Sequence, residues 1–201
     1  TASYNTAVGD QALLDNTTGA ECVAVGHAAL FENTTASYNT ALGNSALRDN
    51  TTGEKNTAVG QDALENNTTG NRNVAVGRIA LYTNTTGHYN SALGQGALYY
   101  NNADYNTSIG YESMNANTTG TRNVGIAPFA LDANTTGSYN VALGYASLSA
   151  NTTADQNTAI GYYALAANTT GHSNVGVGAS ALNSLTTGDS HVAVGFKALE
   201  E

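Results

Sequence analysis

The sequence contains no tryptophan, one proline, one cysteine and one methionine among 201 residues, and only 10% of its residues are charged. A single cysteine excludes an internal disulfide framework. Leu, Ile, Val and Phe are also scarce, because together they make up 35 of the 201 residues. This is below the level of roughly 20% at which disorder has to be considered. A thick globular core is therefore excluded: either the chain is disordered, or a repeating architecture makes a thin core sufficient.

Positive charge is scarce as well, since six Lys and Arg residues stand against fifteen Asp and Glu, for a net charge of −9. This balance argues against a nucleic-acid partner and against a polybasic membrane-binding surface. No run approaches the roughly 20 apolar residues of a membrane-spanning helix. The sequence therefore predicts neither a nucleic-acid partner nor a membrane span.

What the sequence does contain is one motif, repeated twelve times. The anchor run 5–9 (Asn-Thr-Ala-Val-Gly) returns every 17 residues, except for one step of 16 between Asn90 and Asn106. In one-letter code the unit is N-x-A-(V/I/L)-G-x-x-A-L-x-x-N-T-T-G-x-x. Such a fixed period is typical of a solenoid. We therefore expect residues 1–201 to form a single solenoid domain and, because the chain begins in the middle of a unit, to be a fragment of a longer chain.

A second period, of three units, lies above the first. Residues 18–43 resemble residues 69–94, and these in turn resemble residues 119–144. Two interpretations are open: a block of three units was duplicated, or three units share one turn of the structure.

We number the unit positions 1 to 17 from the anchor asparagine. Positions 2–4 are often β-branched and are bounded by Asn and Gly, which is typical of a strand. The glycine at position 5 suits a corner with positive φ, and the Asn-Thr-Thr-Gly run suits a turn. Positions 6–9 are predicted to form a second short strand or, alternatively, one helical turn. The predicted structural ladders are the asparagines Asn39, Asn56, Asn73 and Asn90, the leucines Leu30, Leu47, Leu64 and Leu81, and the glycines Gly26, Gly43 and Gly60.

If each unit is one coil, twelve coils stacked at the strand spacing of about 4.8 Å make a rod on the order of 60 Å long. Each coil is expected to bury the leucine of position 9, the Val, Ile or Leu of position 4, and two alanines. At about 25 cal/mol per Å2 of apolar surface, this burial is small for a single chain. The shortage predicts self-association, with a homotrimer as the hypothesis.

The repeated Asn-Thr-Ala-Val-Gly-x-x-Ala-Leu, followed by Asn-Thr-Thr-Gly, resembles the head repeats of YadA-type trimeric autotransporter adhesins. It is still more similar to the longer repeats of phage tail-fibre and related fibre proteins. The V-A-(V/I)-G core is matched at residues 23–26, 74–77 and 192–195, and the resemblance covers nearly the whole chain. Each unit here carries three additional residues around Leu-x-x-Asn-Thr-Thr. The resemblance implies an all-β fold: a left-handed parallel β-roll that assembles as a homotrimer in an extracellular fibre or adhesin.

No constellation of residues predicts catalysis, a cofactor or a metal ion. Asp189, Ser190 and His191 are neighbours in one turn, so they cannot align as the orienting acid, nucleophile and base of a triad. His88 and His172 share a unit position but lie five coils apart. At the strand spacing this is roughly 24 Å, which is too far for a shared metal ion.

The Asn-Thr-Thr runs allow three interpretations. Side-chain amides that bond from coil to coil would make a structural ladder. Flat threonine arrays on a rigid rod are also the device of ice-binding solenoids, although adjacent threonines in a turn are expected to face different ways. Each run is, in addition, an N-glycosylation sequon. The candidate glycosylation sites are Asn16, Asn33, Asn50, Asn84 and Asn134.

Tyrosine is the main aromatic residue, with twelve copies. Many of these tyrosines occupy unit positions that also accept charged residues, so they are expected to be exposed. An exposed tyrosine offers a large contact area with a polar tip, while ordinary surface or inter-chain packing is the alternative. The candidate contact residues are Tyr38, Tyr89, Tyr99, Tyr100, Tyr105 and Tyr139.

These features predict no enzyme but the structural or adhesive shaft of an extracellular, cell-surface or virion fibre. Its expected partners are further copies of the chain and a cell-surface glycan or protein receptor. One alternative is a self-assembling extracellular filament, because open strand edges at the ends of a repeat array invite stacking. The second alternative is an ice-binding solenoid.

Overall fold

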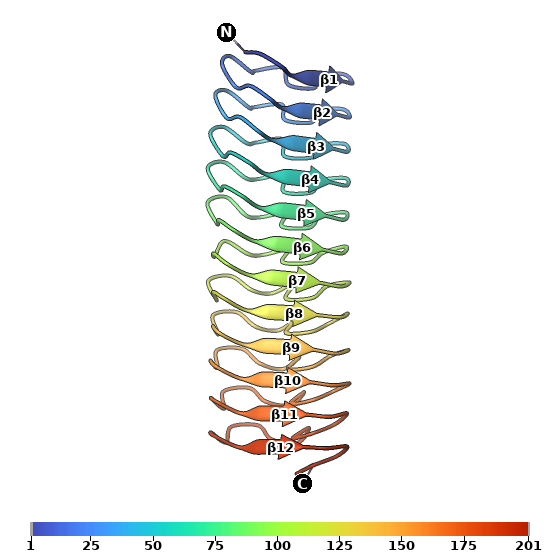
Figure 1. The fold of residues 1–201 in the computed structure, drawn as a ribbon, viewed down its shortest axis with the longest axis vertical. Helices are drawn as coiled ribbons and strands as arrows, with labels where there is room; N and C mark the ends of the chain where they lie inside the picture. Colours follow the sequence, from blue (N-terminus) through green and yellow to red (C-terminus); the bar gives the residue numbers. More distant parts are fainter. Residues whose placement is uncertain (1, 201) are drawn as a thin grey trace.

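The computed structural model, which describes residues 2–200, is a rod of stacked coils (Figure 1). Each unit supplies one strand of three residues, and the twelve strands lie side by side in one sheet. Residues 2–200 contain no further strand and no helix. The strands are β1 (Thr6–Val8), β2 (Val23–Val25), β3 (Thr40–Leu42), β4 (Thr57–Val59), β5 (Val74–Val76), β6 (Ser91–Leu93), β7 (Thr107–Ile109), β8 (Val124–Ile126), β9 (Val141–Leu143), β10 (Thr158–Ile160), β11 (Val175–Val177) and β12 (Val192–Val194).

Every strand pairs in parallel with the strand of the next unit. Ala41 of β3 stands beside Ala58 of β4, and Ala75 of β5 continues the same column. One unit is therefore one coil, and the predicted all-β parallel solenoid is confirmed. The interpretation in which three units share one turn is wrong, so the three-unit period of the sequence does not correspond to a turn of the structure.

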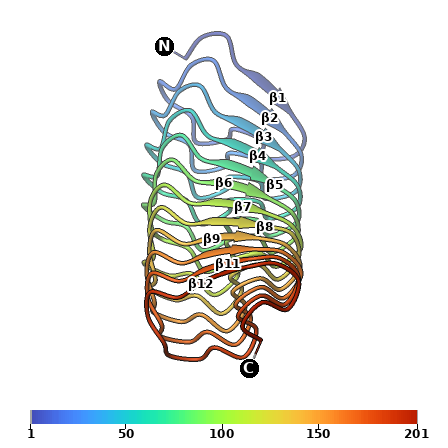
Figure 2. The same cartoon turned by 60° about the horizontal axis from the view of Figure 1, so that its bottom comes forward.

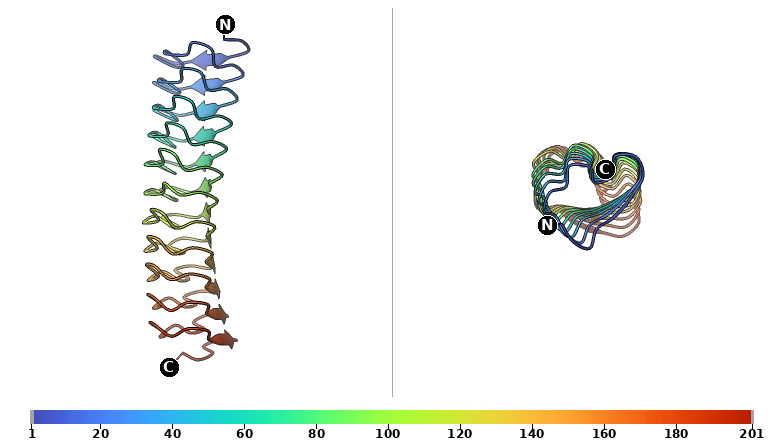
Figure 3. Two further views of the ribbon diagram at one scale, coloured as in Figure 1. Left: turned by 90° about the vertical axis from the view of Figure 1, so that its left-hand side faces the viewer. Right: turned by 90° about the horizontal axis from the view of Figure 1, so that it is seen from above.

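Seen along the rod, each coil is a loop whose other sides carry no strand (Figures 2 and 3). The second strand predicted at positions 6–9 is wrong, and so is the helical turn. Instead these positions form a turn with positive φ at positions 7 and 9, as in Ser45 (52°) and Leu47 (54°). The N–H of Ser45 donates to His27 in the preceding coil, whereas that of Leu47 donates to Ala63 in the following coil. These hydrogen bonds hold the turn to the preceding and the following coil, although the turn contains no strand.

The core is narrow and surrounds a single column of leucines. Side chains alternate along a strand, so the residue at position 3, usually alanine, points inwards and is buried with the position-9 leucine and the position-8 residue. The prediction that position 4 is buried is wrong: Leu42 and Leu93 are each 47% exposed. They belong to the outer face of the sheet together with position 2. The predicted ladder leucines Leu30, Leu47, Leu64 and Leu81 are all fully buried.

Two columns of buried asparagines complete the core. In the position-1 column, Asn56 accepts the backbone N–H of Asn73 (2.9 Å) and donates to the carbonyl of Gly70 (2.8 Å). In the position-12 column, Asn67 donates to Asn50 of the preceding coil and to Gly70. Each amide satisfies backbone or side-chain groups that water does not reach. The predicted ladder residues Asn39, Asn56, Asn73 and Asn90 all lie in the position-1 column and are fully buried.

The 16-residue step shortens the turn after position 12 in the sixth coil. In a regular coil, the N–H groups of Thr68 and Thr69 both donate to the carbonyl of Thr85. In the short coil, the side-chain oxygen of Asn102 takes over and accepts from the N–H groups of Thr85 and Thr86, at 3.1 and 2.9 Å. One side-chain acceptor therefore compensates for the missing residue, and the stack continues without a break.

The corner at position 5 is glycine in every coil but one. Gly26, Gly43 and Gly60 have φ values of 136°, 144° and 133°, and Ala127 occupies the same corner with φ 113°. Residues other than glycine are strained there by about 1–3 kcal/mol. We expect Ala127→Gly to raise the free energy of unfolding by about 1 kcal/mol, measured as a higher midpoint in urea denaturation. A lower midpoint would show that the corner at Ala127 is not strained.

Candidate functional site

The outer face of the sheet carries an apolar strip. Positions 2 and 4 of the strands point outwards, and position 4 is Val, Ile or Leu in every coil. Ile109 and Leu143, for example, are 38% and 43% exposed. Parallel sheets in proteins usually have both faces covered, and contiguous apolar patches on a surface mark interaction sites. This apolar strip, formed by position 4 of β1 to β12 together with the valines that stand at position 2 in six of the strands, is the first candidate functional surface.

The second candidate is the column at position 17, immediately before each strand. Every residue of this column has a positive φ, so the chain turns into the strand there. The column contains four of the six predicted contact tyrosines, namely Tyr38, Tyr89, Tyr105 and Tyr139, and each of them is between 41% and 53% exposed. Tyr99 and Tyr100 lie on a different side of the coil, at positions 10 and 11, where Tyr99 stacks on Tyr82 with ring centroids 5.2 Å apart.

Basic side chains are interleaved with the tyrosines of the position-17 column. The guanidinium of Arg122 lies 5.2 Å from the ring centroid of Tyr105 and 5.5 Å from that of Tyr139. Tyr105 in turn stacks on Tyr89, with the ring planes only 5° apart. Cation–π and stacking contacts thus hold exposed side chains in defined positions along the rod.

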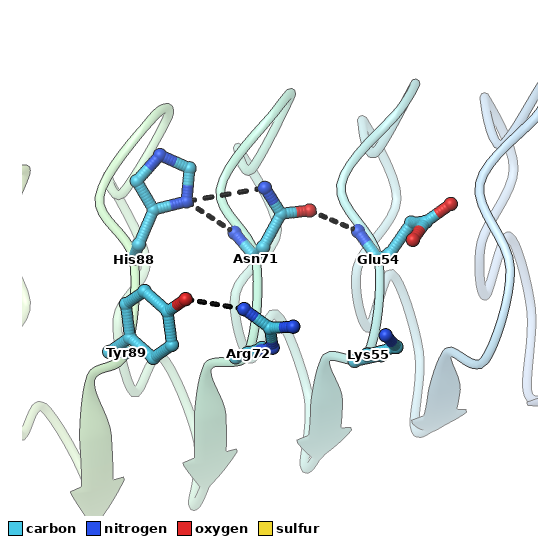
Figure 4. Close-up of a pocket in the computed structure, with 6 residues that line it drawn as sticks. All are labelled: Glu54, Lys55, Asn71, Arg72, His88 and Tyr89. Atoms are coloured by element: carbon cyan, nitrogen blue, oxygen red, sulfur yellow. Dashed lines mark hydrogen bonds between the residues drawn. The ribbon is translucent and has the colours of Figure 1, made fainter.

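The surface is hollowed where two basic residues follow each other in this column. A shallow groove of about 330 Å3 extends there over three successive coils (Figure 4). Asn71 accepts the N–H of Glu54 with its side-chain oxygen, and its own N–H donates to Nδ1 of His88 at 2.9 Å. These bonds fix the floor of the groove. The groove is lined by Glu54, Lys55, Asn71, Arg72, His88 and Tyr89.

A further group of aromatic rings lies just after the corners that follow β7 to β10. Neighbouring ring centroids in this group are between 4.5 and 5.7 Å apart. Sequence reasoning did not select this group as a site, although Tyr145 and Tyr162 are separated by one 17-residue period and so occupy the same place in adjacent coils. The group consists of Tyr111, Phe129, Tyr145, Tyr162 and Tyr163.

The candidate glycosylation sites are part of the position-12 column. Asn33, Asn50, Asn84 and Asn134 are fully buried, and Asn16 is half-buried. Asn50, for example, donates to the side chain of Asn33 and to the carbonyl of Gly53. A glycan on such an amide would break the column, so among the three interpretations of the Asn-Thr-Thr run the burial supports the structural ladder.

The two threonines of the run have different surroundings. The position-13 hydroxyl donates to the next coil, as Thr51 does to the carbonyl of Thr68 at 3.0 Å. The position-14 threonines, such as Thr52, are exposed and form one column. Within the described coils, these two positions therefore do not form a flat two-dimensional array of free hydroxyls.

Several buried or half-buried titratable groups have shifted pKa values. Burial raises the pKa of Glu65, and the ion pair with Arg48 opposes this rise. Burial also raises the pKa of Asp132, whose Oδ1 has no hydrogen-bond partner, and the pKa of the Cys22 thiol, which replaces an anchor asparagine. Glu65 and Asp132 lie four coils apart, so they do not form an acid–base pair.

Asp189 and His191, which have the residue types of a catalytic triad, belong to separate columns near the C-terminal end of the rod. The carboxylate of Asp189 accepts the N–H of His172, and the N–H of His191 donates to Asn174. Within residues 2–200, no three His, Cys, Asp or Glu side chains converge on a place where they could hold a metal ion. The same residues contain no helix with the length and apolar character needed to cross a membrane.

Comparison with known proteins assigns no family, since no protein-family model, no curated protein and no solved structure matches the chain. The apolar strip and the position-17 column remain the two surfaces on which a partner could bind.

Proposed function

We propose that the protein is the structural and adhesive shaft of an extracellular or virion fibre, built as a homotrimer of left-handed β-rolls. The observation that carries this proposal is the apolar strip. Each coil contributes one Val, Ile or Leu at the same outward place, so parallel copies of the chain cover the whole strip in one contact. The number three and the left-handed winding follow from the resemblance to YadA-type head repeats.

The role of the shaft is to extend over a distance and to recognise a receptor. Stability in a solenoid is shared between neighbouring coils, so the rod holds its surface side chains at fixed intervals without a globular core. The position-17 column runs beside the apolar strip and offers exposed tyrosines, whose rings and hydroxyls suit contact with a receptor. A partner at the cell surface, either a glycan or a protein, is the expected ligand of this column.

A measurement of the oligomeric state tests the proposed homotrimer. Light scattering after size-exclusion chromatography is expected to give about three times the chain mass of 20.5 kDa. The double variant Leu93→Glu with Leu143→Glu places two charges in the strip and is expected to give single chains, because a charge buried in an apolar interface is costly. Circular dichroism should show that the β-structure is retained.

A control variant adds one negative charge away from the strip. Ala150→Glu changes a residue at position 11, away from the sheet, where Glu32 stands in an earlier coil, and it should leave the trimer intact. A wild-type mass of one chain would contradict the proposal. Electron micrographs that show fibres much longer than one rod would instead support a self-assembling filament.

A further inference from the structure

Lys55 and Arg72 are the only basic residues of the chain that occupy the same position in consecutive coils. At a spacing of about 4.8 Å, like charges side by side on neighbouring rungs repel each other. Within residues 2–200, neither side chain has a carboxylate oxygen within 4.0 Å, whereas Arg48 and Lys197 both form ion pairs. The two cations are therefore an unneutralised site on a chain whose net charge is −9.

The two cations turn away from each other. Lys55 lies 5.7 Å from the ring centroid of Tyr38 in the preceding coil, and Arg72 lies 5.3 Å from that of Tyr89 in the following coil. The order along the column is thus aromatic ring, cation, gap, cation, aromatic ring. Arg122 provides the contrast, because this single cation sits between two tyrosine rings and has no cationic neighbour in the column.

We propose that the groove between these coils binds a saccharide that carries a carboxylate group. The carboxylate occupies the gap between Lys55 and Arg72, and the sugar lies along the exposed edge of Tyr89, whose two faces are next to Arg72 and Tyr105. This inference deepens the proposed function, on which it rests, by naming the class of receptor. An anion in the gap relieves the repulsion between the cations and gains charge-assisted hydrogen bonds from both, with the arginine able to bind both carboxylate oxygens.

The remaining lining residues suit the hydroxyl groups of a sugar. In Figure 4 the side chains form two parallel rows, with Glu54, Asn71 and His88 beside the cation row. Because Nδ1 of His88 accepts the N–H of Asn71 at 2.9 Å, the neutral ring carries its hydrogen on Nε2. That N–H is left to donate to a ligand, and the carboxylate of Glu54 accepts hydrogen bonds from hydroxyl groups.

The aromatic rings favour a saccharide over a free anion. A pyranose ring carries both C–H groups and hydroxyls, which suits the exposed edge of a tyrosine, with its apolar ring and polar tip. Tyr89 is held in place because it stacks on Tyr105, with the ring centroids 4.9 Å apart, and because Arg72 donates to its hydroxyl. The ring is therefore ordered before a ligand arrives, which lowers the entropic cost of binding.

Titration calorimetry on the full chain tests the ligand class with three probes. Hyaluronan tetrasaccharide supplies glucuronate and N-acetylglucosamine, chitotetraose supplies N-acetylglucosamine alone, and sodium sulfate supplies a bare anion. Hyaluronan tetrasaccharide is expected to bind at least about tenfold more tightly than chitotetraose, since charge-assisted bonds to the carboxylate are lost in the neutral sugar. Sulfate at the same concentration is expected not to displace it.

Single-residue variants test whether the ligand binds in the groove. Lys55→Gln and Arg72→Gln should each weaken hyaluronan binding at least about tenfold, and both should fold, because Gln156 already occupies position 17 in another coil. Arg122→Gln is the matched control at the same position, and it should leave binding within about twofold of wild type. Glu54→Gln should tighten binding, because it removes a negative charge from the groove while its side-chain oxygen still accepts hydrogen bonds from hydroxyl groups.

Four outcomes would overturn the proposal: no binding of the tetrasaccharide, equally tight binding of chitotetraose, displacement by sulfate, or an equal loss in Arg122→Gln. Light scattering on the same samples measures their mass, and this distinguishes a failure of the binding proposal from a failure of the trimer proposal. Because the groove is built from successive coils of one chain, a monomer that still binds contradicts only the trimer. A trimer that does not bind contradicts only the groove.

Discussion

Asn73→Ala is expected to lower the free energy of unfolding by about 2–4 kcal/mol, because it leaves the buried N–H of Asn90 without a partner, at about 1–3 kcal/mol, and removes one of the two hydrogen bonds to the carbonyl of Gly87, at about 1 kcal/mol. Asn73 accepts the N–H of Asn90 at 2.9 Å and donates to the carbonyl of Gly87 at 2.8 Å. Alanine supplies neither bond, and the site is fully buried, so water does not replace the amide. Urea denaturation followed by circular dichroism, at one protein concentration, measures the loss.

The chain itself contains an interruption of this column that serves as a control. Cys22 occupies position 1 of the second coil, and its thiol lies 3.4 Å from the carbonyl oxygen of Ala36. A thiol is a weak donor and a weak acceptor, so Cys22→Asn is expected to raise the free energy of unfolding by about 1 kcal/mol. A loss below about 1 kcal/mol in Asn73→Ala, together with a less stable Cys22→Asn, would mean that the asparagine column is not a main tie between coils.

The sequence was sufficient to predict the coil, the strand and the leucine column. The fixed spacing of 17 residues placed each unit on the next, and the single leucine at position 9 marked the inside of the rod, where Leu47 and Leu64 are fully buried. Size alone places the large residue at position 4 in the core, whereas the alternation of side chains along a strand turns it outwards. A strand that points Ala41 inwards must point Leu42 outwards, and the narrow core has room only for the smaller side chain.

The turn at positions 6–9 was beyond simple pattern reasoning. Leucine in the left-handed region is rare because its β-carbon crowds the backbone, yet Leu47 adopts φ 54° there. Its N–H bond to Ala63 of the next coil and its full burial hold it in that conformation. The context of the stack therefore overrides the local preference of the residue.

The candidate site was predicted only in part, because contact with a ligand depends on neighbours across coils. Tyr38, Tyr89, Tyr105 and Tyr139 were selected for their place in the unit, and the structure brings them into one column. The groove can be predicted only when each repeat unit is compared with the next one. Lys55 and Arg72 are one 17-residue period apart, so reading the sequence in columns would have placed the two charges side by side.

Gly77→Ala is expected to destabilise the rod by about 3 kcal/mol or more, since strain and overlap add. The backbone at Gly77 has φ 131°, a region that costs residues other than glycine about 1–3 kcal/mol. A β-carbon at Gly77 would also lie 2.6 Å from the carbonyl carbon and oxygen of Gly94 in the next coil. The clash is with backbone, so it is relieved only if β5 and β6 move apart. At 2–4 °C per kcal/mol, Tm should fall by roughly 6–12 °C.

Gly176→Ala shows whether this effect comes from the corner or from the loss of any glycine. Gly176 lies in β11 at position 3, where most coils have a buried alanine. Its φ is not positive, and a β-carbon would approach Leu165 and the carbonyl of Ala181 no closer than 3.2 Å. The added methyl group restricts the unfolded chain, so stability should be unchanged or higher by about 0.4–1 kcal/mol.

Gly178→Ala, two residues later in the same coil, should behave like Gly77→Ala, because Gly178 has φ 129° and its β-carbon would overlap the carbonyl of Gly195. Calorimetric melting of the three variants compares them directly. Equal losses at Gly176 and Gly178 would contradict the corner argument. Losses at Gly77 and Gly178 without a loss at Gly176 would show that the rod demands glycine where the chain turns against the backbone of the next coil, and not at every glycine of the unit.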